Sequence, residues 1–286
     1  MIRIGIVGSD NSHADRFCEL TNLERPDLPH VDGLRVVAIC GADPKRTQEV
    51  ATNGKIEKIV SGPREMVGLV DAAFVVYRHG GLHRENVLPL LEAGIPVFVD
   101  KPFACSVADA EAMLNAADRR GVAITSFSTA RVAASFVKFL GGLKPETIRG
   151  GSVVGPCDPD SEYGGHFFYG VHAVEVMLAA FGHRPRSLVA RRVAKTIQAI
   201  VSYERQLVSL RLQHDAGGEF LVTVYTSEGT KPHAIDMSTC YYDGLVITKR
   251  MLETGKRPLS DEELLAPVRV LEAIGRALKS GSDESV

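Results

Sequence analysis

The sequence predicts an α/β protein in which a doubly wound parallel sheet is followed by an α+β domain with an open, mostly antiparallel sheet. The first observation is that apolar runs at 71–76 and 97–99 enclose a loop, the helical pattern 84–93 and the terminating Gly94. This length is typical of a βαβ crossover, which requires parallel strands and right-handed winding. The second observation is that strand and helix patterns alternate through the first 125 residues, as they do in nucleotide-binding domains.

Capping residues and apolar runs locate the other elements of this first part. A strand pattern begins at once in the segment 1–8, and a second strand runs from Leu34 to Cys40. Asp43 and Pro44 begin a helix, because Asp is a preferred N-cap and Pro suits the first helical position. Further helices are expected at 14–23, 63–69 and 106–120, and further strands at 58–60 and 122–127.

The pattern changes between residues 125 and 150, where the predicted helix 131–140 leads into a glycine-rich stretch. We therefore predict a Rossmann-type dinucleotide-binding domain at 1–125 and an α+β domain that binds substrate at 126–286. Alternating polar and apolar residues indicate strands with one solvated face. Their positions are 152–154, 188–193, 197–203, 207–213, 219–226 and 234–237. Helices are predicted at 170–181 and at 261–279. The helix 261–279 could pack back on the first domain. The segment 280–286 is predicted to be disordered.

Charge and composition exclude several classes of partner. The formal net charge of -2 at pH 7 and the absence of a basic stripe give no attraction for nucleic acid or for a membrane surface. Five cysteines without paired spacing argue against a disulfide framework and favour a reducing, cytoplasmic environment. We expect neither a signal peptide nor a membrane span. Small molecules and further copies of the chain are the expected partners.

Lys101 holds the most informative position in the sequence. The apolar run Val97–Val99 is typical of a buried strand, and Asp100, Lys101 and Pro102 follow it. Open α/β sheets bind ligands at the carboxyl ends of their strands, and an ammonium group there can polarise a forming carbonyl oxygen. His172, on the predicted helix 170–181, is a second candidate because an imidazole exchanges a proton near neutral pH.

Four segments together resemble the Gfo/Idh/MocA oxidoreductases, which pair an N-terminal Rossmann domain with a C-terminal domain on an open antiparallel sheet. The opening Ile4–Gly8 is similar to the first strand and turn of that family, and Asp100-Lys101-Pro102 is similar to its Glu-Lys-Pro. Gly170–Glu175 resembles its Gly-x-His-x-x-Asp, and 251–258 resembles the stretch before its last helix. The resemblance covers most of the chain.

The resemblance implies an NAD(P)-dependent dehydrogenase or reductase that moves a hydride to or from a hydroxyl-bearing carbon of a sugar- or polyol-like substrate. Lys101 would hold the substrate near the nicotinamide, His172 would take the hydroxyl proton, and Glu175, one helical turn away, would orient the ring. The family also implies a homo-oligomer that assembles through the C-terminal sheet. The aspartate that the family has four residues before the histidine is Phe168 here, which leaves the polyol class open.

The loop expected to hold the cofactor departs from the dinucleotide fingerprint G-x-G-x-x-G. It reads Gly8-Ser9-Asp10-Asn11-Ser12-His13, so only the first glycine is kept. We expect Asp10 to compete with a diphosphate for the amides at the helix N-terminus. The candidate contacts to NAD or NADP are Gly8, Ser12, His13, His79, His83, Asp100 and Lys101. Those from His79 onwards are implied by the resemblance to the family.

The end of the second predicted strand bears on the choice between NAD and NADP. It reads Cys40-Gly41-Ala42, without the acidic residue that binds a ribose 2′-hydroxyl in dinucleotide-binding domains. Asp43 is expected to be a helix cap. Lys45 and Arg46 follow, either as solvated charges or as partners of a 2′-phosphate.

Two alternatives stay open at this point. The altered fingerprint is compatible with a non-catalytic protein that binds a nucleotide or a sugar-like ligand on the same fold. A metal-assisted enzyme is the other, because imidazoles with a carboxylate can bind zinc or another transition metal. The histidines in question are His13, His79, His83, His166 and His172, together with Asp100 and Glu175.

Overall fold

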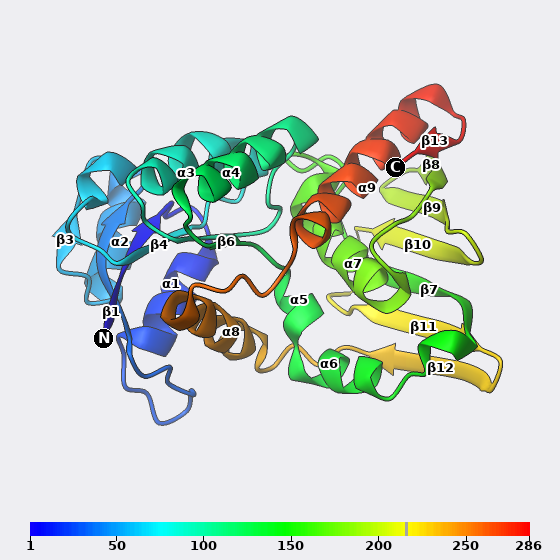
Figure 1. Ribbon diagram of the computed structural model, residues 1–286, viewed down its shortest axis with the longest axis horizontal. Helices are drawn as coiled ribbons and strands as arrows, with labels where there is room; N and C mark the ends of the chain where they lie inside the picture. The colour runs from blue at the N-terminus through cyan, green and yellow to red at the C-terminus, as the bar shows by residue number, and fades with distance from the viewer. Residues whose placement is uncertain (215–216) are drawn as a thin grey trace. The chain divides into compact units, whose positions relative to one another are not determined.

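A computed structural model describes residues 1–214 and 217–286, which form two compact units (Figure 1). Unit 1 consists of residues 1–104, 108–126 and 241–260. Unit 2 consists of residues 105–107, 127–240 and 261–286. Each unit is built on a sheet of its own, and the chain passes between the units more than once.

Unit 1 contains a six-stranded parallel sheet in the order β3-β2-β1-β4-β5-β6. Its strands are β1 (Ile2–Val7), β2 (Leu34–Cys40), β3 (Lys58–Ile59), β4 (Ala72–Val75), β5 (Val97–Val99) and β6 (Ile124–Thr125). Strands β2 and β3 extend the sheet on one side of β1, and β4 to β6 extend it on the other. The strand order therefore reverses at β1 and β4, which is the switch point where doubly wound sheets bind their ligands.

Helices cover both faces of this sheet. They are α1 (Ser12–Thr21), α2 (Pro44–Asn53), α3 (His83–Glu92), α4 (Val107–Arg120) and α8 (Cys240–Thr254), with short 3-10 turns η1 (Pro63–Met66) and η2 (Gly80–Leu82). In Figure 1, α3 and α4 lie on one face, and α1 and α8 lie on the other. Phe17 of α1 packs edge-on against Phe74 and Phe98 of the sheet, with ring centroids 5.4 and 5.9 Å away. Aromatic packing thus joins α1 to the central strands.

Unit 2 contains a seven-stranded sheet in the order β12-β11-β7-β10-β9-β8-β13. Its strands are β7 (Ile148–Pro156), β8 (Ser187–Val193), β9 (Thr196–Ser202), β10 (Leu207–Gln213), β11 (Leu221–Thr226), β12 (Gly229–Ala234) and β13 (Glu284–Ser285). Only the β7–β10 pair is parallel among the described strands of this sheet. Its helices are α5 (Thr129–Val132), α6 (Ala134–Gly141), α7 (His166–Phe181) and α9 (Asp261–Ser280), with the 3-10 turn η3 (Pro145–Thr147).

The fold class predicted from the sequence is confirmed, and several elements differ in detail. The predicted strand 234–237 is wrong, because β12 ends at Ala234. The predicted helix 131–140 is divided, since Ala133 has an extended ψ of 131° between α5 and α6. The predicted disorder of 280–286 is also wrong, because β13 pairs with β8 in this segment.

Helix α8 was not expected from the sequence. Its first turn contains Asp243-Gly244, a pair that is typical of turns, and its interior face has few large apolar residues. No helix in the described residues has the length and apolar character that crossing a membrane requires.

Candidate functional site

Asp100 and Lys101 follow β5 directly and are both buried, with 2% and 3% of their surfaces exposed. The backbone N–H of Asp100 donates to the carbonyl of Val75 at 2.8 Å, which continues the pairing of β4 and β5 beyond the strand ends. Two parallel strands therefore fix the backbone that carries Lys101. This confirms the predicted position of Lys101 at the carboxyl end of a buried strand.

The Asp100 carboxylate is held by two side chains from the segment that follows β1. Asn11 donates from Nδ2 to Oδ2 of Asp100 at 2.8 Å, and His13 Nδ1 lies 2.7 Å from the same oxygen. Burial by itself would raise the pKa of Asp100, but the positive charge and hydrogen bond of His13, and the neighbouring Lys101, lower this pKa to about 2. Asp100 is therefore a carboxylate that organises the switch point of the sheet.

Asn11, and not Asp10, caps helix α1. The side-chain oxygen of Asn11 accepts from the N–H of His13 at 3.2 Å, whereas Oδ2 of Asp10 accepts from the N–H of Arg78 at 3.2 Å. We had expected Asp10 to compete for the amides of the first turn. Its charge is instead directed to the loop after β4.

The turn between β1 and the first turn of α1 has features that fit a dinucleotide. Gly8 has a φ of +107°, and a Cβ there would lie 2.9 Å from the backbone nitrogen of Tyr77, so the sharp turn after β1 requires glycine. Ser12 is exposed at the first turn of α1, where helix amides and dipole favour a phosphate. A tight glycine turn that leads into a helix N-terminus is the local geometry at which doubly wound sheets bind a pyrophosphate.

Gly41, directly after β2, is closely packed. A Cβ at Gly41 would lie 2.2 Å from Oγ of Ser9 and 2.6 Å from Oγ1 of Thr47, and these two hydroxyls are 2.8 Å apart. Oδ1 of Asp43 accepts from the N–H groups of Lys45 and Arg46, at 2.9 and 3.2 Å. Asp43 is thus the N-cap of α2, as predicted.

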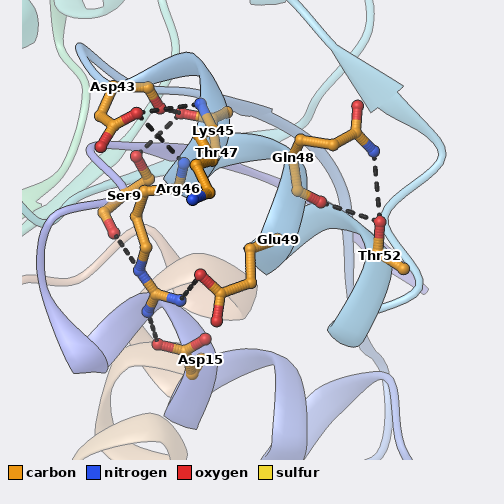
Figure 2. Close-up of polar contacts among 9 residues, drawn as sticks. All are labelled: Ser9, Asp15, Asp43, Lys45, Arg46, Thr47, Gln48, Glu49 and Thr52. Carbon is orange, nitrogen blue, oxygen red and sulfur yellow. Dashed lines mark hydrogen bonds and ion pairs between the residues drawn. The ribbon is translucent and has the colours of Figure 1, made fainter.

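Arg46 connects α2 with α1 and with the loop between β1 and α1 (Figure 2). Its Nε donates to the carbonyl of Ser9 at 3.1 Å, its Nη2 pairs with Asp15, and its Nη1 lies 3.2 Å from Glu49. Two carboxylates therefore offset the charge that would attract an NADP 2′-phosphate.

His83 and His79 are engaged with backbone groups near the end of β4. His83 is fully buried, and its Nε2 and Nδ1 lie 2.9 and 3.2 Å from the carbonyls of Tyr77 and Phe103. Burial lowers the pKa of His83, which favours the neutral ring. Nδ1 of His79 accepts from the N–H of Gly81 at 3.0 Å and caps η2. His83 thus links the loops that follow β4 and β5.

The histidine cluster proposed as a metal site is not found. Within residues 1–214 and 217–286, no three His, Cys, Asp or Glu side chains form a group suited to a metal ion. His166, for example, lies with Nε2 at 2.8 Å from the carbonyl of Leu271. The histidines serve separate local contacts.

His172 and Glu175 lie on α7 in unit 2, and both are buried. Nδ1 of His172 lies 2.6 Å from Oγ of Ser128, and Oε1 of Glu175 accepts from the N–H of Ser128 at 2.9 Å. Sequence reasoning missed Ser128. Its signal was its place directly after the predicted strand 122–127 and shortly before the predicted helix 131–140, where a serine is typical of an N-cap residue.

Phe168, at the position of the missing aspartate, takes part in an aromatic contact. Its ring centroid lies 5.0 Å from that of Tyr163. Phe168 offers no carboxylate to His172. The hydroxyl of Ser128, directly before α5, contacts the imidazole instead.

Comparison with known proteins decides the family of the first part of the chain. A family model described as an oxidoreductase family with an NAD-binding Rossmann fold, Gfo/Idh/MocA, matches residues 2–127. This part of the chain belongs to the Gfo/Idh/MocA family. The resemblance predicted from the sequence is thereby confirmed.

Curated relatives that match this region are named as dehydrogenases of inositols or of a sugar. Inositol 2-dehydrogenase 3 of Saccharopolyspora erythraea is 31% identical over 121 residues, which covers 42% of this chain and 33% of that protein. A scyllo-inositol 2-dehydrogenase (NADP(+)) of Bacillus subtilis is 24% identical over 204 residues, covering 64% of this chain and 59% of that protein. The chain thus spans only a third of the first relative's length and less than two thirds of the second's.

The solved structures extend the likeness to the whole fold. Myo-inositol dehydrogenase from Lactobacillus casei, in complex with NAD(H) and myo-inositol, has a TM-score of 0.84 at 15% identity, covering 100% of this chain and 97% of that one. GenD2 from gentamicin A biosynthesis, in complex with NAD, has a TM-score of 0.84 at 17% identity, with 100% of this chain and 96% of that one covered. At such identity the likeness establishes the fold alone.

Proposed function

We propose that the protein is an NAD(P)-dependent dehydrogenase or reductase that transfers a hydride to or from a hydroxyl-bearing carbon of a sugar- or polyol-like substrate. The observation that carries this proposal is the buried Asp100-Lys101 pair at the end of β5, held by Asn11 and His13 at the switch point of the sheet. Burying a lysine is costly in free energy, so a lysine at this place suggests a functional use of its charge. The names of the relatives support the substrate class.

Each catalytic residue has a separate role in this proposal. Lys101 polarises the substrate oxygen, and His172 accepts the hydroxyl proton in oxidation and returns it in reduction. Glu175 is a positioning residue: its carboxylate accepts a hydrogen bond from the N–H of Ser128 and so acts through Ser128. When bound, the nicotinamide accepts or supplies the hydride.

We further propose that residues 1–125 bind the dinucleotide and that 126–286 contribute substrate binding. The predicted cofactor contacts are those at Gly8, Ser12, His13, His79, His83, Asp100 and Lys101. His83 would contribute through the loops that it joins, since both ring nitrogens face backbone carbonyls. Either NAD or NADP suits the proposal.

Titration calorimetry with NAD+, NADH, NADP+ and NADPH is the first experiment, followed by a screen of inositols and sugars with the nucleotide that binds. We expect micromolar binding and turnover by the wild-type protein, and loss of turnover by at least about a thousandfold in Lys101→Met. A nucleotide that binds without turnover of any polyol would favour the alternative of a non-catalytic binding protein. Absence of binding by all four would refute the dehydrogenase proposal.

We also propose that the protein is a cytoplasmic homo-oligomer that pairs through the sheet of unit 2. Ile200, Leu207, Leu221 and Tyr225 expose apolar surface on its strands, at 38%, 60%, 38% and 45%. Sedimentation velocity tests the assembly. A single boundary at the monomer mass would contradict it.

A further inference from the structure

The backbone N–H and the hydroxyl of Ser128 take part in three hydrogen bonds within unit 2. Its Oγ lies 2.6 Å from Nδ1 of His172 and accepts from the N–H of Ala130 at 3.1 Å, and its N–H donates to Oε1 of Glu175 at 2.9 Å. Ser128 is 0% exposed, and His172 and Glu175 are 5% and 4% exposed. With so little surface exposed, these groups have little access to water as a substitute partner.

The Oγ atom of Ser128 has limited freedom because Ala130 occupies one of its acceptor positions. The remaining acceptor position can accept a hydrogen bond from the Nδ1–H of His172. A neutral ring with hydrogen on Nδ1 presents its lone pair at Nε2. In the protonated ring, Nδ1 still carries hydrogen, so the same hydrogen bond persists before and after proton transfer at Nε2.

We propose that Ser128 is the positioning residue for His172 and makes Nε2 the atom that exchanges the proton. This inference rests on the proposed function. In oxidation the substrate hydroxyl proton passes to Nε2 as the hydride passes to the nicotinamide, and the Nδ1–H donates to Ser128 throughout. In reduction the imidazolium returns the proton from Nε2. Atoms and charges balance because the ring gains and loses one proton.

The surroundings of Ser128 hold it in place. It is the N-cap of α5, and the next turn is fixed by Arg131, whose Nη2 lies 2.6 Å from Oε1 of Glu263 at the start of α9. The Glu175 carboxylate holds the Ser128 backbone from α7. Because α5, α7 and α9 all contribute, the hydroxyl is fixed relative to the imidazole, which limits misplacement of the reacting atom.

The test compares Ser128→Gly with Ser128→Thr. Glycine caps a helix nearly as well as serine but carries no hydroxyl, whereas threonine keeps the hydroxyl. Thr248→Val is the matched control, since Thr248 is a buried hydroxyl in α8 that donates to the carbonyl of Gly244. Each variant is assayed for kcat and KM across pH. The ring nitrogens of His172 are followed by 15N NMR, with His172→Gln used to assign the signals.

For Ser128→Gly we expect kcat to fall about tenfold or more with KM within about threefold, and the acid limb of the kcat profile to move roughly half a unit to lower pH. The His172 signals should shift towards hydrogen on Nε2. Ser128→Thr should restore kcat and the NMR pattern, and Thr248→Val should match wild type in both. Wild-type kcat, pH profile and ring signals in Ser128→Gly would overturn the inference.

Failure of the proposed function is distinguishable from failure of this inference. If the wild-type protein turns over no polyol with either nucleotide, the dehydrogenase proposal fails. The NMR experiment then still decides whether Ser128 fixes the ring: a change of His172 tautomer in Ser128→Gly supports it, and identical spectra refute it.

Discussion

The side-chain amide of Asn11 donates to the Asp100 carboxylate across 2.8 Å and so fastens the start of α1 to the residue after β5. Asn11 also caps α1 with its side-chain oxygen. One side chain therefore performs two tasks that substitution can separate.

Replacing Asn11 with Asp keeps the cap but places a second carboxylate against Asp100. We expect the free energy of unfolding at pH 7 to fall by about 2–4 kcal/mol, because two buried like charges then face each other. Asn11→Ser is the control: its hydroxyl keeps a capping oxygen, but the amide group that donates to Asp100 is lost, which costs about 1 kcal/mol. Urea unfolding measures both. Equal losses in the two variants would contradict the charge argument.

The depressed pKa of Asp100 predicts a specific dependence of stability on pH. Its folded pKa of about 2 lies below the ordinary carboxyl value, so its contribution is present above about pH 4 and is lost as the pH falls towards 2. We expect wild type to be more stable than Asp100→Asn from pH 5 to 7, by up to about 2 kcal/mol. That difference should shrink below pH 4. Urea unfolding at each pH measures it, and a pH-independent difference would be the contrary result.

Gly41 should tolerate no side chain. We expect Gly41→Ala to lower stability by about 1–3 kcal/mol, since its Cβ would overlap Oγ of Ser9 and Oγ1 of Thr47. Gly62→Ala is the matched control, because no atom outside its chain neighbours lies within 4 Å of a Cβ there and its φ of -176° is ordinary extended backbone. Thermal unfolding compares them. Similar melting temperatures for both variants would remove the argument from close packing.

Removing the two carboxylate partners of Arg46 should change the preference between NADPH and NADH. With Asp15→Asn and Glu49→Gln combined, we expect the affinity for NADPH relative to NADH to rise by about tenfold, because the guanidinium charge is no longer offset. Lys45→Met, which changes an exposed neighbour, should alter the ratio by less than about threefold. Calorimetric titration with both nucleotides measures the ratio. A ratio unchanged from wild type in the double variant would place the 2′-phosphate away from Arg46.

The fold was predictable where local signals and tertiary packing agree. The strands of unit 1 are short buried apolar runs, and Asp43-Pro44 carries both features that begin a helix, so their positions follow from the sequence. Helix α8 was not predictable because Asp243-Gly244 signals a turn and its packing against α1 is decided by Tyr241. The β13 pairing likewise depends on a distant strand, β8.

The site was predictable in part for a related reason. The positions of Lys101, directly after β5, and of His172, on α7, follow from their sequence context. Asn11 and Ser128 act through partners 89 and 44 positions away, so nothing in their neighbourhood reveals these contacts. A polar side chain that serves as both cap and long-range partner looks in sequence like a cap alone.

Unit 1 is completed only by residues 241–260, which follow most of unit 2 in the chain. During synthesis the six strands therefore leave the ribosome long before the helix that sets Tyr241 against His13 and Phe17, with ring centroids 5.0 and 6.5 Å away. Folding of unit 1 cannot finish in order from the N-terminus. An excised fragment ending at residue 126 would lack this late helix, so a stable isolated version has to carry 241–260 along by a new connection.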